Sequence, residues 1–407
     1  MVLRHAAMLE VNEFLVLDFV REHEWTTRPQ IGRALELSAA SVSRIVGRLL
    51  HAGLVVEGGA RAATGGRPAT VISFNRRAGA VIAVDLGATR CDGALADLSG
   101  ELLYQEARPT RAQGAAFPTL LASVDALRAE ASRQDVPVAA VAVGVPAILD
   151  PDSGLGVGGP NVEWDGFEVV GSLAARLDVP FVVENDVNLA ALAHAWRGEG
   201  RRVADFFTLY IGTGIGGAIV ANGRLVKGHH NAGGEVGYLV VRAEQLRRPL
   251  DHGLGGLESL ASGPAIVERA RRLLAPDDVA SVLRDGELSL ETVFDAAGSG
   301  DPIGRRVVRE VLDHVGMALV AVAAIVDPAL VILDGPVGRL LEPHLDVLSG
   351  FLRARHPLPP RLVVSRLRGN STLIGAVAAA LQLARQRTAP AALFGAFDVS
   401  GSVSGRG

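Results

Sequence analysis

Two separate runs of this chain share one pattern, in which an apolar strand enters a glycine turn and a second apolar strand leaves it. The first run is AVIAVDLGATRCDGALADLSGELL, residues 80–103, and the second is YIGTGIGGAIVANGRL, residues 210–225. Glycines in such turns let backbone N–H groups close on an anion, as they do in loops that hold phosphate. Two such units in one chain predict two similar lobes around a cleft.

These turns supply the candidates for a phosphate site. Asp85 stands at a strand end, where a carboxylate beside a glycine and a hydroxyl can organise Mg²⁺ and phosphate. A later strand and glycine turn, ALVILDGPVG, adds a third wall. The D-x-G-x-T spacing alone is a weak signal, because many β-hairpins contain it. The candidates, for a nucleotide site that is either active or vestigial, are Asp85, Gly87, Thr89, Gly212, Thr213, Gly214 and Gly335.

A polar cluster, Glu184-Asn185-Asp186, follows another buried strand and precedes a helix that is predicted to begin near Val187. In α/β sheets, ligands bind at the carboxyl ends of such strands. Three roles suit the Asp186 carboxylate: general base on a sugar hydroxyl, acceptor of hydrogen bonds from a sugar, or simple helix cap.

The first eighty residues carry the pattern of a helix-turn-helix. An amphipathic helix is predicted over 12–23, a short helix over 28–35 capped by Thr27, and a longer one from Ser38 to a stop near Gly53. Two helices joined by a tight turn, the second with a small and basic outer face, are typical of DNA recognition. The inner face of the second helix is apolar and consists of Val42, Ile45, Val46, Leu49 and Leu50.

A β-hairpin wing is predicted next, from the strands LVVE and TVISF with the loop GGARAATGGRPA between them. Residues 25–80 hold eight arginines against two glutamates, although the whole chain has a net charge of −4. A solvated charged face, or a small helical domain that binds protein, is the alternative explanation. Helix spacing, wing and charge together predict binding to double-stranded DNA. The predicted contacts are Arg28, Ser38, Ala40, Ser41, Ser43, Arg44, Arg48 and, in a minor groove or on phosphate, Arg67.

Composition limits the remaining classes. Apolar residues make up 49% of the chain and charged residues 21%, which is typical of globular proteins. Neither terminus carries an apolar run of membrane-spanning length or a signal-peptide pattern, so we expect a cytoplasmic protein without a membrane partner. The single cysteine, Cys91, is expected to be a small buried apolar group.

From about residue 12 to 385 the chain resembles the ROK family of sugar kinases and sugar-responsive repressors. The most specific segments are GTGIGGAIVANGRLVKGHHNAGGEVGY and ENDVNLAALA, and the helix-turn-helix resembles the branch of xylose- and N-acetylglucosamine-responsive repressors. The resemblance implies an α/β protein, with a winged helix-turn-helix before a two-lobed actin/hexokinase-like (ribonuclease H-like) ATPase-type domain. It implies that Asp186 is the catalytic base if the chain is a kinase. It also implies that sugar hydroxyls are held by Asn161, Asn185, Asp186, Glu235 and Glu258.

The chain departs from the family pattern at the zinc site. Where the family carries a histidine, this chain has Tyr238, which can donate a hydrogen bond to a sugar and stack on its face. The family's three cysteine positions hold Pro249, Asp251 and Gly256. Because all four zinc ligands are missing, we expect no zinc and no cofactor, and either packing or the ligand must order the loop. Another metal could be bound by Asp251, His252, His229 and His230, but a histidine pair beside a glycine is more often a loop feature, so we expect no metal.

The nucleotide side departs as well. Asp334 stands where the family favours paired glycines, and its carboxylate is expected to disfavour adenosine or phosphate nearby. We therefore expect a non-enzymatic transcriptional regulator, a repressor by preference, that binds operator DNA and a small sugar or sugar-phosphate effector. The alternatives are an ATP-dependent sugar kinase with an accessory DNA-binding domain and a non-catalytic scaffold.

The expected division of the chain is a winged helix-turn-helix domain over 1–78, a sugar-binding and kinase-like domain of two lobes over 79–388, and a flexible tail over 389–407. A homodimer or a dimer of dimers is expected, since palindromic operators match proteins with two-fold symmetry.

Overall fold

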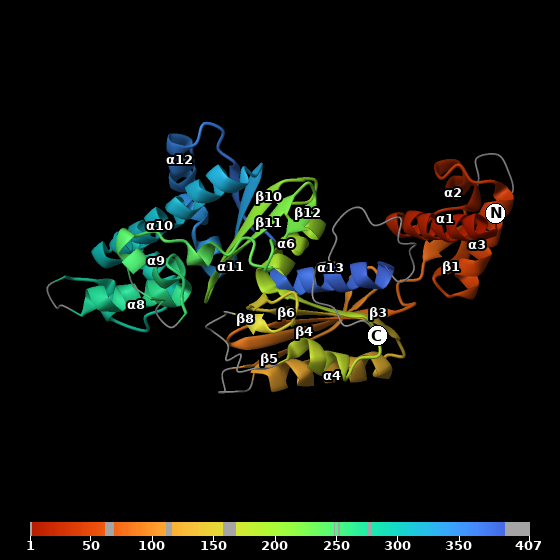
Figure 1. The fold of residues 1–407 in the computed structure, drawn as a ribbon, viewed down its shortest axis with the longest axis horizontal. Coiled ribbons are helices and arrows are strands. Elements are labelled where there is room, and N and C mark those ends of the chain that lie inside the picture. Colours follow the sequence, from red (N-terminus) through yellow and green to blue (C-terminus); the bar gives the residue numbers. More distant parts are fainter. Residues whose placement is uncertain are drawn as a thin grey trace.

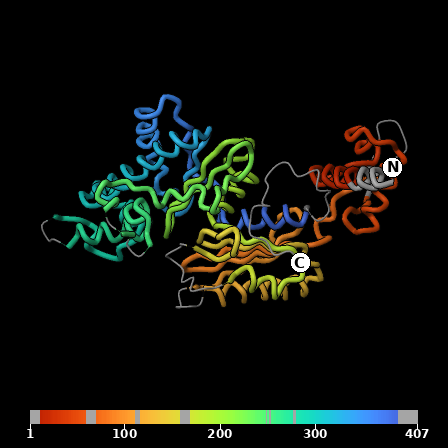
Figure 2. Tube along the Cα trace, in the orientation of Figure 1, coloured from red at the N-terminus to blue at the C-terminus, as the bar shows by residue number. Residues whose placement is uncertain are grey.

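A computed structural model describes residues 2–61, 69–110, 116–157, 168–247, 249–250, 253–275 and 279–386. The chain folds into a helical head followed by two lobes, each built on a five-stranded sheet (Figure 1). The head lies at one end of the molecule, beside the first lobe. The C-terminal helix returns to the first lobe, as the blue segment beside the orange and yellow ones in Figure 2 shows.

The head contains three helices and a hairpin, namely α1 (Val2–Glu22), α2 (Arg28–Ala34), α3 (Ala39–His51), β1 (Val55–Arg61) and β2 (Ala69–Phe74). Helix α1 begins well before its predicted start. The wing strands extend into the segment predicted as loop, because Arg61 still pairs with Ala69. The arrangement is the predicted winged helix-turn-helix.

The starts of α2 and α3 and the core of α3 follow the sequence pattern, with two corrections. Ser38 caps α3 by accepting a hydrogen bond from the Ser41 N–H at 3.2 Å. The Thr27 hydroxyl instead bonds the Gln30 side chain at 2.8 Å, so it does not cap α2. The predicted inner face of α3 is buried, except that Leu50 is only partly buried.

The first lobe is a mixed sheet in the order β5-β4-β3-β6-β9. Its strands are β3 (Ala80–Leu86), β4 (Arg90–Asp97), β5 (Leu102–Pro109), β6 (Val138–Val145) and β9 (Phe181–Asn185). The first three strands are antiparallel, while β6 and β9 run parallel to β3. Helix α4 (Ala116–Arg133) covers one face, and α6 (Asp186–Arg197) and α13 (Ser371–Gln386) cover the other. Cys91 is buried in this core, as predicted.

The second lobe repeats this topology in the order β12-β11-β10-β13-β14. Its strands are β10 (Phe206–Ile211), β11 (Ile215–Ala221), β12 (Arg224–Val226), β13 (Leu330–Asp334) and β14 (Arg361–Val364). Again the first three strands are antiparallel, and the last two run parallel to β10. Each predicted strand–turn–strand unit therefore forms the first hairpin of a lobe.

The remaining elements surround these sheets. In the first lobe they are β7 (Ile148–Leu149), β8 (Gly156–Val157) and α5 (Val169–Ala174). In the second lobe they are η1 (Val236–Tyr238), η2 (Ala243–Arg247), α7 (Glu258–Ala261), α8 (Gly263–Leu274), η3 (Val282–Arg284), α9 (Leu290–Gly298), α10 (Pro302–Val326), α11 (Gly335–Leu340), η4 (Glu342–His344) and α12 (Leu345–Arg355). No helix in the described part of the chain has the length and apolar character that a bilayer crossing requires.

Helices α6 and α13 touch backbone to backbone. A Cβ placed on Gly375 of α13 would lie 1.7 Å from the carbonyl oxygen of Leu189 on α6. Only glycine permits this approach, because any side chain at that position would overlap the neighbouring helix.

Candidate functional site

A cavity of about 170 Å³ lies between the two lobes. The first lobe contributes the turn after β3, the segment after β6 and the start of α6 to its lining. The second lobe contributes the turn between β10 and β11, η1 and the first residue of α7. Both sequence units that predicted a cleft therefore meet at it.

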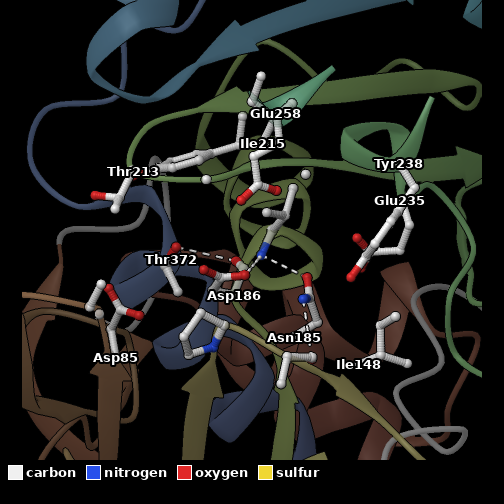
Figure 3. A pocket seen from close by; sticks show the side chains of 18 residues that line it. Asp85, Ile148, Asn185, Asp186, Thr213, Ile215, Glu235, Tyr238, Glu258 and Thr372 are labelled. Carbon is white, nitrogen blue, oxygen red and sulfur yellow. Dashed lines mark hydrogen bonds between the residues drawn. The ribbon is translucent and has the colours of Figure 1, made fainter. Parts of the chain in front are cut away.

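The cavity gathers all but one of the residues that were predicted to bind the sugar. These are Asn185, Asp186, Glu235, Tyr238 and Glu258. Figure 3 shows Asp186 in the middle, with Glu235 and Tyr238 on one side and Asp85 and Thr213 on the other. Asn161 lies outside the described residues.

The start of α6 fixes the place of Asp186. The Asn185 side chain caps the helix, accepting hydrogen bonds from the N–H groups of Val187 at 2.9 Å and Asn188 at 3.1 Å. Its amide also donates to the Ala147 carbonyl at 3.3 Å, which ties the helix start to the segment after β6. Because Asn185 caps the helix, Asp186 is the first helical residue and its carboxyl lines the cavity.

Three carboxyl groups of the lining have raised pKa values. Burial, reinforced by neighbouring carboxylates, raises the pKa of Asp186 to about 7. Burial also raises the pKa of Asp85 to about 7, against the hydrogen bond from Asn370. Burial and the charge of Glu258 raise the pKa of Glu235 to about 7. Carboxyls in this range accept hydrogen bonds from hydroxyl groups and can exchange protons at neutral pH.

The predicted phosphate residues divide into two sets. Asp85, Gly87, Thr213 and Gly214 line the cavity. Thr89, Gly212 and Gly335 do not lie among the lining residues. The left-handed φ of +82° at Gly335 explains the glycine there, because a Cβ would lie 2.5 Å from the Ile211 carbonyl oxygen.

The Asp334 carboxylate does not line the cavity and is not the open charge that the sequence suggested. Its side chain is 1% exposed and bonds the His194 ring at 2.9 Å. It also accepts the Gly335 N–H at 2.7 Å, and the other His194 nitrogen lies 3.1 Å from Glu199. Burial opposes ionisation of both groups, yet these hydrogen bonds lower the pKa of Asp334 and raise that of His194. The aspartate is therefore half of a buried ion pair.

The loop that carries zinc in the family is closed here by one side chain. The Gln245 carbonyl accepts the N–H groups of Val241 and Arg242, both at 3.0 Å, and its amide donates to the Gly256 carbonyl at 2.7 Å. A Cβ at Gly256 would lie 2.5 Å from the Leu239 carbonyl oxygen, so this position does not accommodate a cysteine. The residues present do not fit the family's zinc, although Asp251 lies outside the described residues.

Within the described ranges, no three His, Cys, Asp or Glu side chains gather in a metal-binding arrangement. The absence of zinc stays a prediction.

The sequence analysis did not predict a salt bridge that joins the two lobes beside the site. Lys227, the one lysine of the chain, follows β12 and bonds the buried Glu184 of β9 at 2.5 Å. Glu184 in turn accepts hydrogen bonds from the Asn185 N–H at 2.9 Å and the Asn188 amide at 3.0 Å. Asn231 adds a second tie, because its amide donates to the Leu149 carbonyl at 2.8 Å. No sequence pattern indicated this pairing, except that a lone lysine is itself unusual.

The outer face of α3 presents the predicted DNA contacts. Ser38, Ala40, Ser43, Arg44 and Arg48 are exposed and Ser41 is partly buried. Arg67 lies outside the described residues.

Two of the arginines predicted to contact DNA are ion-paired within the head. Arg28 pairs with Glu57 of the wing, and Arg48 lies 3.1 Å from Glu13 of α1. Within the described residues Arg44 makes no ion pair, which leaves it the most available cation on this helix.

Together, a winged helix-turn-helix and a two-lobed body with a carboxylate-lined cleft define a protein that couples a DNA-binding head to a sugar kinase-like fold. The ROK family pattern matches residues 81–383, and the MarR family pattern matches residues 9–67. The chain therefore belongs to the ROK family.

Known relatives align along most of the chain. The xylose repressor of Caldicellulosiruptor bescii is 25% identical over 92% of this chain and 96% of its own length. The DNA-binding transcriptional dual regulator NagC of Escherichia coli is 28% identical over 81% of each chain. The crystal structure of a ROK family transcriptional regulator, a homologue of the Escherichia coli MLC protein, has a TM-score of 0.77 at 22% identity. It covers 94% of this chain and 99% of its own. That likeness establishes the shared fold of head and lobes.

Proposed function

We propose that this chain is a sugar-responsive transcriptional regulator, by preference a repressor, that binds operator DNA through its head. A small sugar in the interlobe cavity sets its affinity for DNA. The relatives named as repressors support this function, as does the exposed basic face of α3.

The observation that carries the proposal is that one helix runs from the cavity to the head. Helix α13 has 16 residues and is therefore ~24 Å long. At its start, Thr372 lines the cavity and donates to the Asp186 carbonyl at 3.2 Å. Just before it, the Asn370 amide donates to Asp85 at 2.5 Å. The Asp85 carboxylate and the backbone of Asp186 are thus both bonded to the start of α13.

The other end of α13 meets the head. Burial and the like charge of Arg385, near the end of α13, lower the pKa of Arg21 on α1 to about 10. The Arg21 guanidinium lies 4.6 Å from the ring centre of Phe74, a residue that packs against both the head core and the α13 face of the first lobe. A displacement of α13 therefore acts directly on the head.

The connection between head and lobe is short and hydrogen-bonded. Strand β2 ends at Phe74 and β3 begins at Ala80. Asn75 bonds the head through the Gly53 carbonyl at 2.8 Å, and the Arg76 carbonyl accepts the Leu98 N–H of the first lobe at 3.0 Å. Such a linker passes a change of lobe orientation to the head instead of absorbing it.

The mechanism is linkage between two binding sites. A sugar that contacts both lobes favours one lobe arrangement, and the arrangement sets the position of the head. In a two-fold homodimer the two recognition helices must match half-sites about one DNA turn apart or a multiple of it. A change of head position then changes operator affinity.

The test is a titration of the full-length protein with DNA from upstream of its own gene, followed by fluorescence anisotropy, with and without each sugar of a neutral panel. We expect at least one sugar to change the dissociation constant by 5- to 150-fold, the usual size of allosteric coupling. Equal affinity with every sugar, or no binding at low salt, contradicts the proposal.

Arg385→Ala tests the role of α13 in this response. We expect it to alter the ratio of DNA affinities with and without sugar while the sugar affinity is kept. Arg355→Ala, at the end of α12 in the second lobe, is the matched control.

An ATP-dependent sugar kinase is the second candidate, favoured by the Asp186 carboxyl with a pKa of about 7 in the cavity. In that role Asp186 takes the proton of the attacking hydroxyl. Sugar-dependent ADP release that is lost in Asp186→Asn supports the kinase. Turnover near zero across common hexoses and pentoses rejects it.

A further inference from the structure

Two segments of the second lobe bring carboxyl groups to the cavity, and a side chain outside the lining bridges them. Resting on the proposed function, we infer that Gln245 is a positioning residue, which holds the carboxyls of Glu235 and Glu258 in place for the sugar without a metal ion. In the family this loop depends on zinc, whose ligand positions carry other residue types in this chain.

The two carboxyl-bearing segments are in direct contact. Glu235 immediately precedes η1, Glu258 is the first residue of α7, and both side chains line the cavity. The Leu257 N–H donates to the Gly237 carbonyl at 3.1 Å, so the residue before α7 is bonded to the middle of η1. A shift of either segment against the other would therefore separate two groups that face the same ligand space.

Gln245, in η2, bonds both segments at once. Its carbonyl oxygen accepts the N–H groups of Val241 and Arg242, both at 3.0 Å, shortly after η1. Its amide donates at 2.7 Å to the carbonyl of Gly256, two residues before α7. The same carbonyl also accepts the Ser259 hydroxyl at 2.9 Å, so it is satisfied on both sides. One planar amide thus sets the spacing of the two segments.

Only an amide side chain of this length supplies both halves of the bridge. The glutamine oxygen has two lone pairs, which match the two N–H groups of the first segment, and its nitrogen is the donor for the second. A glutamate of the same length accepts but does not donate. Groups that support a binding residue in this way fix its position before the ligand arrives.

The first segment is itself anchored to the second lobe. The Arg242 guanidinium donates to the His314 ring nitrogen Nε2, with distances of 3.2 Å from Nε and 3.1 Å from Nη2. His314 lies on α10 and is 5% exposed. Burial and the charge of Arg242 lower the pKa of His314, which keeps the ring neutral and able to accept. Val241 packs against the hydrophobic core of the lobe. Gln245 therefore ties the second segment to a fixed support.

The donors of this loop suit hydrogen bonds better than a metal. Gly256, at one of the family's cysteine positions, offers a carbonyl that Gln245 already uses. Tyr238 stands in place of the family's histidine. Burial and the charges of Glu235 and Glu258 raise the pKa of Tyr238, so its phenol stays protonated and is a poor metal ligand.

Calorimetric titration of the full-length protein with a neutral sugar panel that includes D-xylose, D-glucose and N-acetyl-D-glucosamine tests this role. Gln245→Ala should bind the sugar that the parent binds about tenfold more weakly. Gln245→Glu keeps an acceptor for the first segment but has no donor for Gly256, so it should show a similar loss. Glu244→Gln, an exposed neighbour in η2, is the matched control and should bind like the parent.

Double-mutant cycles separate positioning from a general loss of structure. If Gln245 acts through Glu235, then Glu235→Gln should weaken binding at least about threefold less in Gln245→Ala than in the parent. Asp186→Asn, on the first-lobe side of the cavity, should have the same effect in both backgrounds. The urea midpoint of Gln245→Ala should match that of the parent, because none of the η2 residues is buried.

Chelation tests whether a metal shares the task. Exhaustive dialysis against EDTA should leave the sugar affinity of the parent unchanged, and added zinc should not restore that of Gln245→Ala.

The outcomes are separable. Unchanged affinity in Gln245→Ala, full affinity in Gln245→Glu or equal coupling in the two cycles overturns this inference, because the bridge then has no specific part in binding. A loss on chelation that zinc reverses overturns it as well, since a metal then holds the loop. All these results leave a sugar-responsive regulator standing. Failure of the whole panel to bind the parent overturns the proposed function and this inference together.

Discussion

The two lobes share one strand order, and each has an aspartate at the end of a central strand. The two aspartates differ in their partners and in the direction of their pKa shifts. Asp85, near the end of β3, lines the cavity, and burial raises its pKa to about 7. Asp334, the last residue of β13, is 1% exposed and paired with His194, and its pKa is lowered in spite of its burial. The first carboxyl faces the ligand space, and the second belongs to the core.

This contrast teaches how a kinase-like cleft can be used for sensing. A carboxyl that is buried without an opposite charge raises the energy of the empty protein, and a hydroxyl donor from a ligand lowers it. A carboxylate that is already paired gives nothing to a ligand and holds two elements together instead. At these two strand ends, the Asp85 carboxyl remains available to a ligand, while the Asp334 carboxylate fixes the structure through its pair with His194.

The largest expected effect is on the paired aspartate. His194→Ala removes the buried partner of Asp334, leaves the more distant Arg339 at 3.7 Å, and should lower the free energy of unfolding by about 3–5 kcal/mol. Urea denaturation measures this loss, and sugar affinity of the folded fraction should be kept.

The double variant with leucine at both positions of the pair is the control. It should recover much of the stability, because apolar replacement of a buried ion pair is often neutral. If His194→Ala lowered the free energy of unfolding by less than about 1 kcal/mol, the two groups would not form a buried ion pair. A loss of that size is typical of an ion pair on the surface.

The next effect concerns the cavity. Asp186→Asn should weaken sugar binding by about 10- to 100-fold, because a hydrogen bond to a charged group contributes about 1.5–3 kcal/mol. Calorimetric titration measures the affinity, with Asp178→Asn at an exposed site as the matched control. Unchanged affinity in Asp186→Asn would remove this carboxyl from the sugar site.

The head also contains both arginines with an ion-pair partner and an arginine without one among the described residues. Arg44→Ala should weaken operator binding about tenfold, or by about 1.4 kcal/mol, and reduce the salt dependence by about one counterion. Arg28→Ala should cost less, because Arg28 already pairs with Glu57. Anisotropy titrations at several salt concentrations measure both, and the reverse ranking would show that the recognition helix is misplaced.

The smallest effect is the pH dependence of stability in the sugar-free protein. Since the pKa of Asp85 in the folded state is about 7, above its usual value of 3.8, its protonated form favours folding. That contribution is present below about pH 4 and is lost as the pH rises through 7. Asp85→Asn should therefore lose about 1 kcal/mol less than the parent between pH 6 and pH 7 in denaturation experiments. An equal loss in both proteins would mean that Asp85 is charged and partnered throughout.

Much of the architecture could be predicted from local patterns. The inner face of α3 follows a helical period, and the cap at Ser38 is a short-range signal. The two strand–turn–strand units predicted the two lobes, and five residues assigned to sugar binding do meet in one cavity. Each of these patterns is local, because the residues that form it are close together in the sequence.

What could not be predicted depends on partners far apart in the chain. From the sequence alone, Asp334 is expected to repel a phosphate group. The structure pairs it with His194, which lies 140 residues earlier in the chain. The carbonyl and amide of Gln245 close a loop that in the family depends on metal, and no motif indicates a glutamine in that role. Electrostatic character in this protein is set by tertiary pairing, which residue type alone does not specify.

The contact of Gly375 with the Leu189 carbonyl has a mechanical consequence. Where helices meet through side chains, rotamer changes can take up a small shift before it reaches the next element. Here no side chain lies between the two backbones, so the joint has no slack. We therefore expect a small displacement at the cavity end of α6 to move α13 with it, because the two backbones are in direct contact.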